Sequence, residues 1–199
     1  MRLVMDRCAE NPEISRRKAS YLTRHALQVI GNDPEILTNA ALLAHFSEQD
    51  IGAMIGLVDR ALALNPSFAR GWYVSGFLRA FAGQPDLALQ HVRNSRRLSS
   101  RERMGQPLAV MGMAYFFKRQ FDAAVAKLVL AIEDDPGFSP PYRTLAACYA
   151  HMGRLDEPRA IIAKLRAITS QVMPSDLPWR KPEGRELFLS GLRLAAGEG

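Results

Sequence analysis

The chain has 199 residues, a hydrophobic content of 48% and a formal net charge of +6 at pH 7. This composition is that of a folded protein and excludes a chain that is disordered throughout. No apolar run approaches the ~20 residues of a membrane-spanning helix, and residues 1–10 lack the apolar core of a secretory signal. We therefore expect a soluble protein that stays in the cytoplasm.

The first predicted element is an amphipathic helix over residues 14–30. Its apolar residues recur at helical spacing: Ile14, Ala19, Leu22, Ala26, Leu27 and Ile30. This helix is similar to the second half of the repeated units described below, so we assign residues 13–33 to a partial N-terminal unit. Because repeat arrays normally end in capping units, a start in mid-unit suggests a piece of a longer chain.

A period of 34 to 36 residues follows this helix. Pro66, Ser100 and Pro136 are separated by 34 and then 36 residues. Three further registers keep the same step: Thr38, Trp72, Leu108 and Tyr142; Met54, Ala88, Ala124 and Pro158; Ala61, Ser95, Ala131 and Leu165. A repeat of this length indicates stacked helix pairs. We divide the chain into four full units at 35–68, 69–104, 105–138 and 139–172.

Within each unit the residue types predict two helices joined by short turns. Gly76 lies four residues after Trp72, and Gly112 lies four residues after Leu108, the equivalent residue of the next unit. At this position two helices approach closely and a large side chain would not fit. Gly83 ends the first helix, as a C-terminal glycine commonly does. Pro66 ends the second helix, because proline has no backbone donor to continue it.

These residues together resemble the tetratricopeptide-repeat (TPR) pattern. The matching stretches are 71–76 with Ala88, 111–115 with Ala124 and Pro136, and Tyr142 with Leu145, Ala146, Tyr149 and Gly153. The resemblance covers residues 34 to 170. It implies an all-α fold, a right-handed superhelical solenoid of antiparallel helix pairs with about ten helices.

The last predicted element is a helix over residues 182–196, which follows a proline-rich segment containing Trp179. Its apolar residues are Leu187, Phe188, Leu192 and Leu194. A solenoid exposes apolar surface at its end, so we expect this helix to cap the array. The alternative is that it folds back into the groove of the solenoid.

In TPR arrays the first helix of every unit lines the concave side, and the resemblance implies which residues face this groove. The candidates are Phe46, Arg70, Tyr73, Phe77, Phe81, Met113, Phe116, Phe117, Arg143 and His151. Apolar patches and aromatic anchors mark interaction surfaces, so we predict a groove that binds an extended peptide or an amphipathic helix. The alternative is that several of these aromatic residues belong to the ordinary core between helices.

No catalytic, metal or cofactor motif is present in the sequence. The histidines form no metal-binding pair: His25, His45, His91 and His151. Neither a glycine-rich phosphate loop nor a calcium loop occurs. The two cysteines, Cys8 and Cys148, match no metal spacing and are expected to be free thiols. We therefore expect no enzymatic activity, no metal and no cofactor in this chain.

A narrower resemblance concerns residues 61–88, 138–147 and 188–195. They resemble the C-terminal TPR region of bacterial class III adenylate/guanylate cyclase-like proteins, in which a nucleotide cyclase domain precedes the repeats. Nothing in this chain resembles that catalytic domain. The resemblance implies a regulatory or assembly region of a cyclic-nucleotide signalling protein. Its partner would be a protein, a peptide or another domain of the same parent chain.

Two other functions stay open. The chain could be a free-standing TPR adaptor, with or without self-association into a homo-oligomer. It could also be a basic helical array that binds nucleic acid, which would depend on its arginines. The densest of these are Arg93, Arg96, Arg97, Arg101 and Arg103. Solvated helix faces and turns explain the scattered arginines better, so we expect neither nucleic acid nor a membrane as the partner.

Overall fold

The computed structural model describes residues 17–18, 21–22, 25, 28, 31–44, 50–99, 105–154, 156–174 and 180–197. These residues contain nine helices of more than two turns and no strand. The helices are α3 (Pro34–Ala44), α4 (Ile51–Leu64), α5 (Ala69–Phe81), α6 (Pro85–Leu98), α7 (Gly105–Phe117), α8 (Phe121–Asp134), α9 (Ser139–His151), α10 (Asp156–Ile168) and α11 (Pro182–Ala196). The expected all-α class is confirmed. Most of the helix predicted over residues 14–30 lies outside the described residues.

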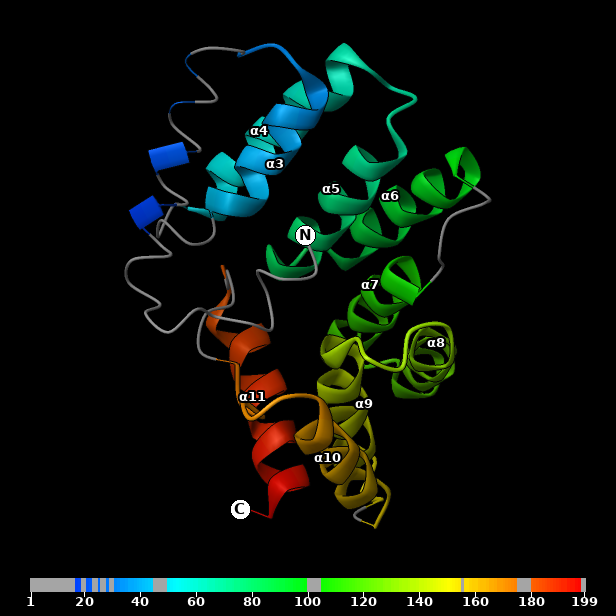
Figure 1. Cartoon of the computed structure of the whole chain (residues 1–199). Helices are drawn as coiled ribbons and strands as arrows, with labels where there is room; N and C mark the ends of the chain where they lie inside the picture. The colour runs from blue at the N-terminus through cyan, green and yellow to red at the C-terminus, as the bar shows by residue number, and fades with distance from the viewer. Residues whose placement is uncertain are drawn as a thin grey trace.

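Helices that are adjacent in the chain pair with each other (Figure 1). The pairs are α3 with α4, α5 with α6, α7 with α8, and α9 with α10. The second helix of each pair also contacts the first helix of the next pair. None of the helices in the described part of the chain is long and apolar enough to cross a membrane.

Two glycines allow close approach within helix pairs, as the sequence predicts. A Cβ atom on Gly76 would lie 2.6 Å from Cγ2 of Val92 and 3.0 Å from the carbonyl oxygen of Ala88. A Cβ atom on Gly112 would lie 2.5 Å from Cγ of Leu128. A larger residue at either position would force these neighbouring atoms to shift.

The turn inside each of the last three pairs contains a residue in the left-handed conformation. Gly83 and Gly153 both have φ of 73°, and Arg119 has φ of 57° at the equivalent place. The backbone N–H of each of these residues bonds to a carbonyl in the last turn of the preceding helix. Because glycine adopts this conformation without steric cost, Arg119 is the one strained member of the three.

Aromatic side chains hold the turns between two successive pairs. The indole Nε1 of Trp72 donates a hydrogen bond of 2.8 Å to the carbonyl of Pro66. The hydroxyl of Tyr142 donates one of 2.9 Å to the carbonyl of Pro136. The two residues that stand at the same position of the repeat thus anchor the preceding proline turn in the same way.

The C-terminal helix α11 packs along α9 (Figure 1). This contact is as extensive as the one between α9 and its own partner α10, whereas the contact between α10 and α11 is slight. The sequence led us to expect a cap over the end of the array, which would have placed α11 mainly against α10. The contacts instead place it on the side formed by first helices, because that side offers it an apolar and aromatic surface.

Candidate functional site

Rings from α5, α7 and α9 form a continuous chain on the side of the solenoid where α11 lies. The ring centroids of Phe77 and Phe81 are 5.0 Å apart, and those of Phe81 and Phe117 are 6.4 Å apart. Phe117 lies 5.5 Å from Phe116, which lies 5.9 Å from His151. These separations are typical of edge-to-face and tilted aromatic pairs. We call Phe77, Phe81, Phe117, Phe116 and His151 the aromatic row.

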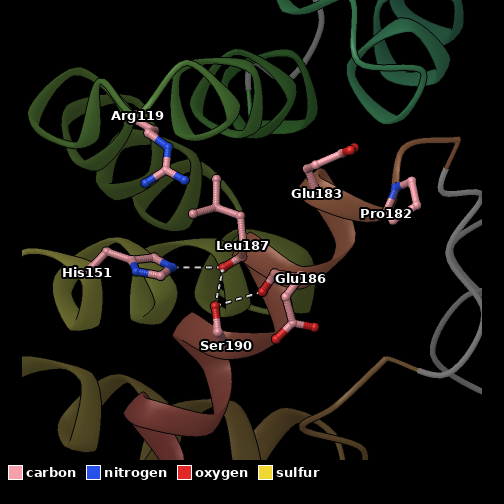
Figure 2. A pocket seen from close by; sticks show the side chains of 7 residues that line it. All are labelled: Arg119, His151, Pro182, Glu183, Glu186, Leu187 and Ser190. Atoms are coloured by element: carbon pink, nitrogen blue, oxygen red, sulfur yellow. Dashed lines mark hydrogen bonds between the residues drawn. The ribbon is translucent and has the colours of Figure 1, made fainter.

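Helix α11 docks on the aromatic row through one ring and one hydrogen bond. The ring of Phe188 meets that of Phe116 edge-on at 6.0 Å. Nε2 of His151 lies 2.7 Å from the carbonyl oxygen of Leu187 (Figure 2). A carbonyl oxygen only accepts, so Nε2 carries the proton and donates it.

A glycine sets the distance between α11 and α9. A Cβ atom on Gly191 would lie 2.7 Å from Nε2 of His151 and 2.9 Å from Cβ of Ala147. The next inward residue, Leu192, is fully buried. The crossing therefore depends on the absence of a side chain at residue 191.

The start of α11 reaches the helices nearer the N-terminus. A Cβ atom on Gly184 would be in ordinary contact with the ring of Phe117, at 3.8 Å. The backbone N–H of Arg180 donates a hydrogen bond of 3.3 Å to the carbonyl of Phe81 at the end of α5. The C-terminal segment thus spans three first helices: α5, α7 and α9.

Five of the ten predicted groove residues form the aromatic row, and the candidates differ in exposure. Four are buried: Phe81, Met113, Phe116 and Arg143. Five are partly exposed: Arg70, Tyr73, Phe77, Phe117 and His151. Phe46 lies outside the described residues. The predicted apolar stripe is therefore partly core, and α11 covers some of it.

Arg143 serves the structure. Its guanidinium donates to the carbonyls of Gln171 and Val172, at 2.7 and 3.0 Å, and to the hydroxyl of Ser139, at 2.9 Å. These bonds hold the segment after α10 against the start of α9. Because charged donors strengthen such bonds, Arg143 fixes the segment directly after α10.

Arg70 and Tyr73 lie in the first half of α5. Nη2 of Arg70 donates a hydrogen bond of 2.6 Å to the side-chain oxygen of Asn39. Nη1 of Arg70 lies 3.7 Å from the carboxylate oxygen Oε1 of Glu35. These contacts link α5 to α3. Burial raises the pKa of Tyr73 to about 12, although the nearby charge of Arg70 lowers it in part. Tyr73 is therefore a neutral hydrogen-bonding group at any physiological pH.

An open pocket of about 540 Å³ lies beside α11 (Figure 2). It is lined by Arg119, His151, Pro182, Glu183, Glu186, Leu187 and Ser190. The hydroxyl of Ser190 donates to the carbonyl of Glu186 at 2.7 Å, so neither Ser190 nor His151 is arranged as a nucleophile with a base. The pocket forms a polar border along the docked helix α11.

A second polar cluster joins α4, α5 and α6. Arg79 binds both carboxylate oxygens of Asp59 at 3.0 Å and the hydroxyl of Ser75 at 2.6 Å. Nδ1 of His91 lies 3.1 Å from the same hydroxyl, and its ring meets that of Trp72 edge-on at 4.8 Å. Because Ser75 is completely buried, no substrate can reach it. This cluster ties two helix pairs together.

The remaining candidates for chemistry have structural explanations. Cys148 is a buried free thiol, and burial raises its pKa to about 12; Cys8 lies outside the described residues. In the parts of the chain that the structure covers, no group of three potential metal ligands occurs. Arg93, Arg96 and Arg97 are exposed on α6, and Arg101 and Arg103 fall outside the described residues.

Sequence reasoning missed two parts of this site. Arg119 follows Gly83 by 36 residues and precedes Gly153 by 34, so the period could have located it in the turn. The role of Gly191 and His151 as the crossing point of α11 and α9 has no such signal. It depends on where the last helix lies in space.

This chain is similar to known proteins in its three-dimensional structure, and the sequence comparisons found no match. No family model matches the chain. Nor does any curated protein match it in sequence.

Solved structures resemble this chain over most of its length. PilW, a widely conserved type IV pilus biogenesis factor, superposes with a TM-score of 0.68 and 16% identity, over 92% of this chain and 80% of PilW. TTC0263, a thermophilic TPR protein of Thermus thermophilus, superposes with a TM-score of 0.64 and 18% identity, over 83% of this chain and 84% of TTC0263. YrrB, a TPR protein with an unusual peptide-binding site, superposes with a TM-score of 0.52 and 21% identity, over 88% of this chain and 91% of YrrB. The paired helices and these likenesses together show that the chain has the fold of a tetratricopeptide-repeat solenoid.

Proposed function

We propose that this chain is a protein-interaction module that binds an amphipathic helix or an extended peptide along the aromatic row. The observation that carries the proposal is the row itself, since aromatic side chains supply much of the binding energy at interfaces. Phe77 and Phe117 keep part of their surface exposed. Helix-in-groove recognition uses such an apolar surface.

The polar groups beside the row favour a partner that offers hydrogen-bond acceptors. Arg70 and Tyr73 lie on α5 toward one end, and the guanidinium of Arg119 borders the pocket at the other. YrrB, a TPR protein with an unusual peptide-binding site, has the same fold, so the fold is able to carry peptide binding. We propose binding without catalysis, metal or cofactor, in the cytoplasm.

Site-specific photo-crosslinking tests this proposal. Phe77 is replaced by a photoreactive phenylalanine derivative in the full chain, and Leu130 is replaced in the same way as the control. Leu130 is exposed on α8, a second helix of its pair. We expect discrete adducts with partner proteins in a cell extract from residue 77 and not from residue 130. Equal labelling at both positions would show that the row is not the interaction surface.

A finer proposal concerns the parent protein. The likeness of residues 61–88, 138–147 and 188–195 to the repeat region of cyclase-like proteins favours a regulatory or assembly arm of a cyclic-nucleotide signalling protein. Co-expression with a class III cyclase domain from the same genome tests it. We expect co-purification and a changed cyclase rate. A cyclase domain that neither binds nor responds would leave the free-standing adaptor as the better description.

A further inference from the structure

We propose that α11 is an internal occupant of the partner's binding site, so that a partner helix with the contact pattern of α11 must displace it. This inference rests on the proposed function. It adds the chemistry of the partner, which is an amphipathic helix with a small residue at its centre, and a means of control, which is competition with the chain's own last helix.

The pattern of α11 is that of a helix bound in a groove. Its inward residues are Phe188, Gly191, Leu192 and Ala195, all buried. They recur at steps of three and four, as do the anchors of helices that bind apolar grooves. The opposite side carries exposed charged residues, including Glu186 and Arg193, which form an ion pair with each other. The helix is therefore amphipathic, with its apolar side directed at α7 and α9.

The receiving surface specifies this pattern at two points. His151 donates to the main-chain carbonyl of Leu187, and any helix lying in the same place offers such a carbonyl. The space opposite Ala147 and His151 admits no Cβ atom at residue 191 without displacement. A competing helix therefore needs glycine there, three residues after a large apolar anchor.

The attachment of α11 suits exchange. Its contact with α10, the helix that precedes it in the chain, is slight, and its main contact is with α9. The helix is thus held as a tethered ligand. Tethering gives such a segment an effective concentration of roughly millimolar, so a free helix binds appreciably only when the tethered one is weakened or outcompeted.

Binding of a labelled peptide spanning residues 180–197 tests the inference on the full chain. The wild-type chain is compared with Gly191→Leu, in which the tethered helix no longer fits. We expect the Gly191→Leu chain to bind the wild-type peptide about tenfold or more tightly than the wild-type chain does, because its tethered competitor is disabled. A peptide carrying Gly191→Leu should bind neither chain. Leu194→Ala changes an exposed residue of α11, so this variant chain should bind the wild-type peptide with the same affinity as the wild-type chain does.

A second measurement covers the case in which Gly191→Leu lowers stability too far for binding to be measured. A protease site is inserted between Pro174 and Arg180, and the folded chain is cut after purification. We expect the cut chain to keep its own α11, to exchange it for the labelled peptide, and to retain its helical circular dichroism throughout.

Four outcomes overturn the inference, and the last of them leaves the proposed function intact. The first is equal peptide binding by the wild-type and Gly191→Leu chains. The second is a folded Gly191→Leu chain that binds no peptide. The third is a wild-type dimer formed by exchange of α11, which would make a second copy the occupant. If crosslinks from residue 77 are the same in both chains, the partner binds beside α11. The proposed function would then stand without this inference.

Discussion

His91 shows how a buried environment changes a single side chain. Burial, and to a smaller degree the charge of Arg79, lower its pKa from 6.5 to about 4, while Asp59 raises it in part. The imidazole is therefore neutral in the fold at pH 7. It lies beside the hydroxyl of Ser75 and against the edge of Trp72, where a positive charge next to Arg79 would be unfavourable.

This environment predicts a loss of stability in mild acid. Between pH 6.5 and about pH 4 the unfolded chain binds a proton at His91 and the folded chain does not. The free energy of unfolding therefore falls as the pH falls through this window and is insensitive to His91 above it. Urea unfolding at pH 7 and pH 5 measures the change. We expect the His91→Gln chain to be less stable than wild type at pH 7. Its free energy of unfolding should, however, fall less than that of wild type between pH 7 and pH 5. An equal loss in both chains would remove His91 as the cause.

Some residue-level features follow from the sequence and some do not. The period correctly predicted the close approach at Gly76 and Gly112, because a repeated contact leaves a repeated small residue. It did not reveal that Phe116 is fully buried while its neighbour Phe117 is partly exposed. Both lie on the first helix of one unit. Their difference arises from α9 and α11, which come from distant parts of the chain.

At the scale of helices, glycine has opposite effects in two places. Gly76 lies where α5 touches α6, with a Val92 methyl carbon and the Ala88 carbonyl oxygen in the way of any Cβ. Gly56 lies inside α4, and a Cβ there would meet nothing within 4 Å. Glycine in a helix costs stability relative to alanine unless close contact requires it.

This contrast predicts stability changes of opposite sign for one type of substitution. We expect Gly76→Ala to destabilise the chain by about 1–3 kcal/mol, since overpacking must separate α5 from α6. Gly56→Ala should stabilise it by roughly 0.5–1 kcal/mol through helix propensity. Chemical denaturation of both variants beside wild type measures the two changes. A stabilising Gly76→Ala would contradict the close packing of this pair.

The existence of the helices was predictable, but the position of the last one was not. Repeats, turn glycines and prolines are local signals, and they indicated α3 to α10 from the chain alone. Whether α11 covers the end of the array or its inner side depends on the relative apolar surface of two places in space. The apolar pattern of α11 is compatible with both, and the aromatic row decides in favour of the inner side.

At the scale of the whole molecule, the chain returns on itself. The segment before α11 brings the chain back to the end of α5, and α11 then runs from there over α7 to α9 (Figure 1). The hinge of this return is the segment after α10, which Arg143 holds through the carbonyls of Gln171 and Val172. A groove candidate of the fourth unit thus holds the segment that follows α10.

Arg143→Met therefore tests whether the hinge determines the position of α11. The substitution keeps much of the apolar volume and leaves the carbonyls of Gln171 and Val172 without their donor, which costs about 1–3 kcal/mol. We expect amide hydrogen exchange to become faster in residues 169–174 and in α11 and to stay unchanged in α5 and α6. Arg159→Met is the matched control, because Arg159 is exposed on α10 in a surface ion pair with Asp156 and such residues contribute little. If exchange in α11 is the same in both variants, contacts with α9 alone hold this helix, and a partner would compete with those contacts without any help from the hinge.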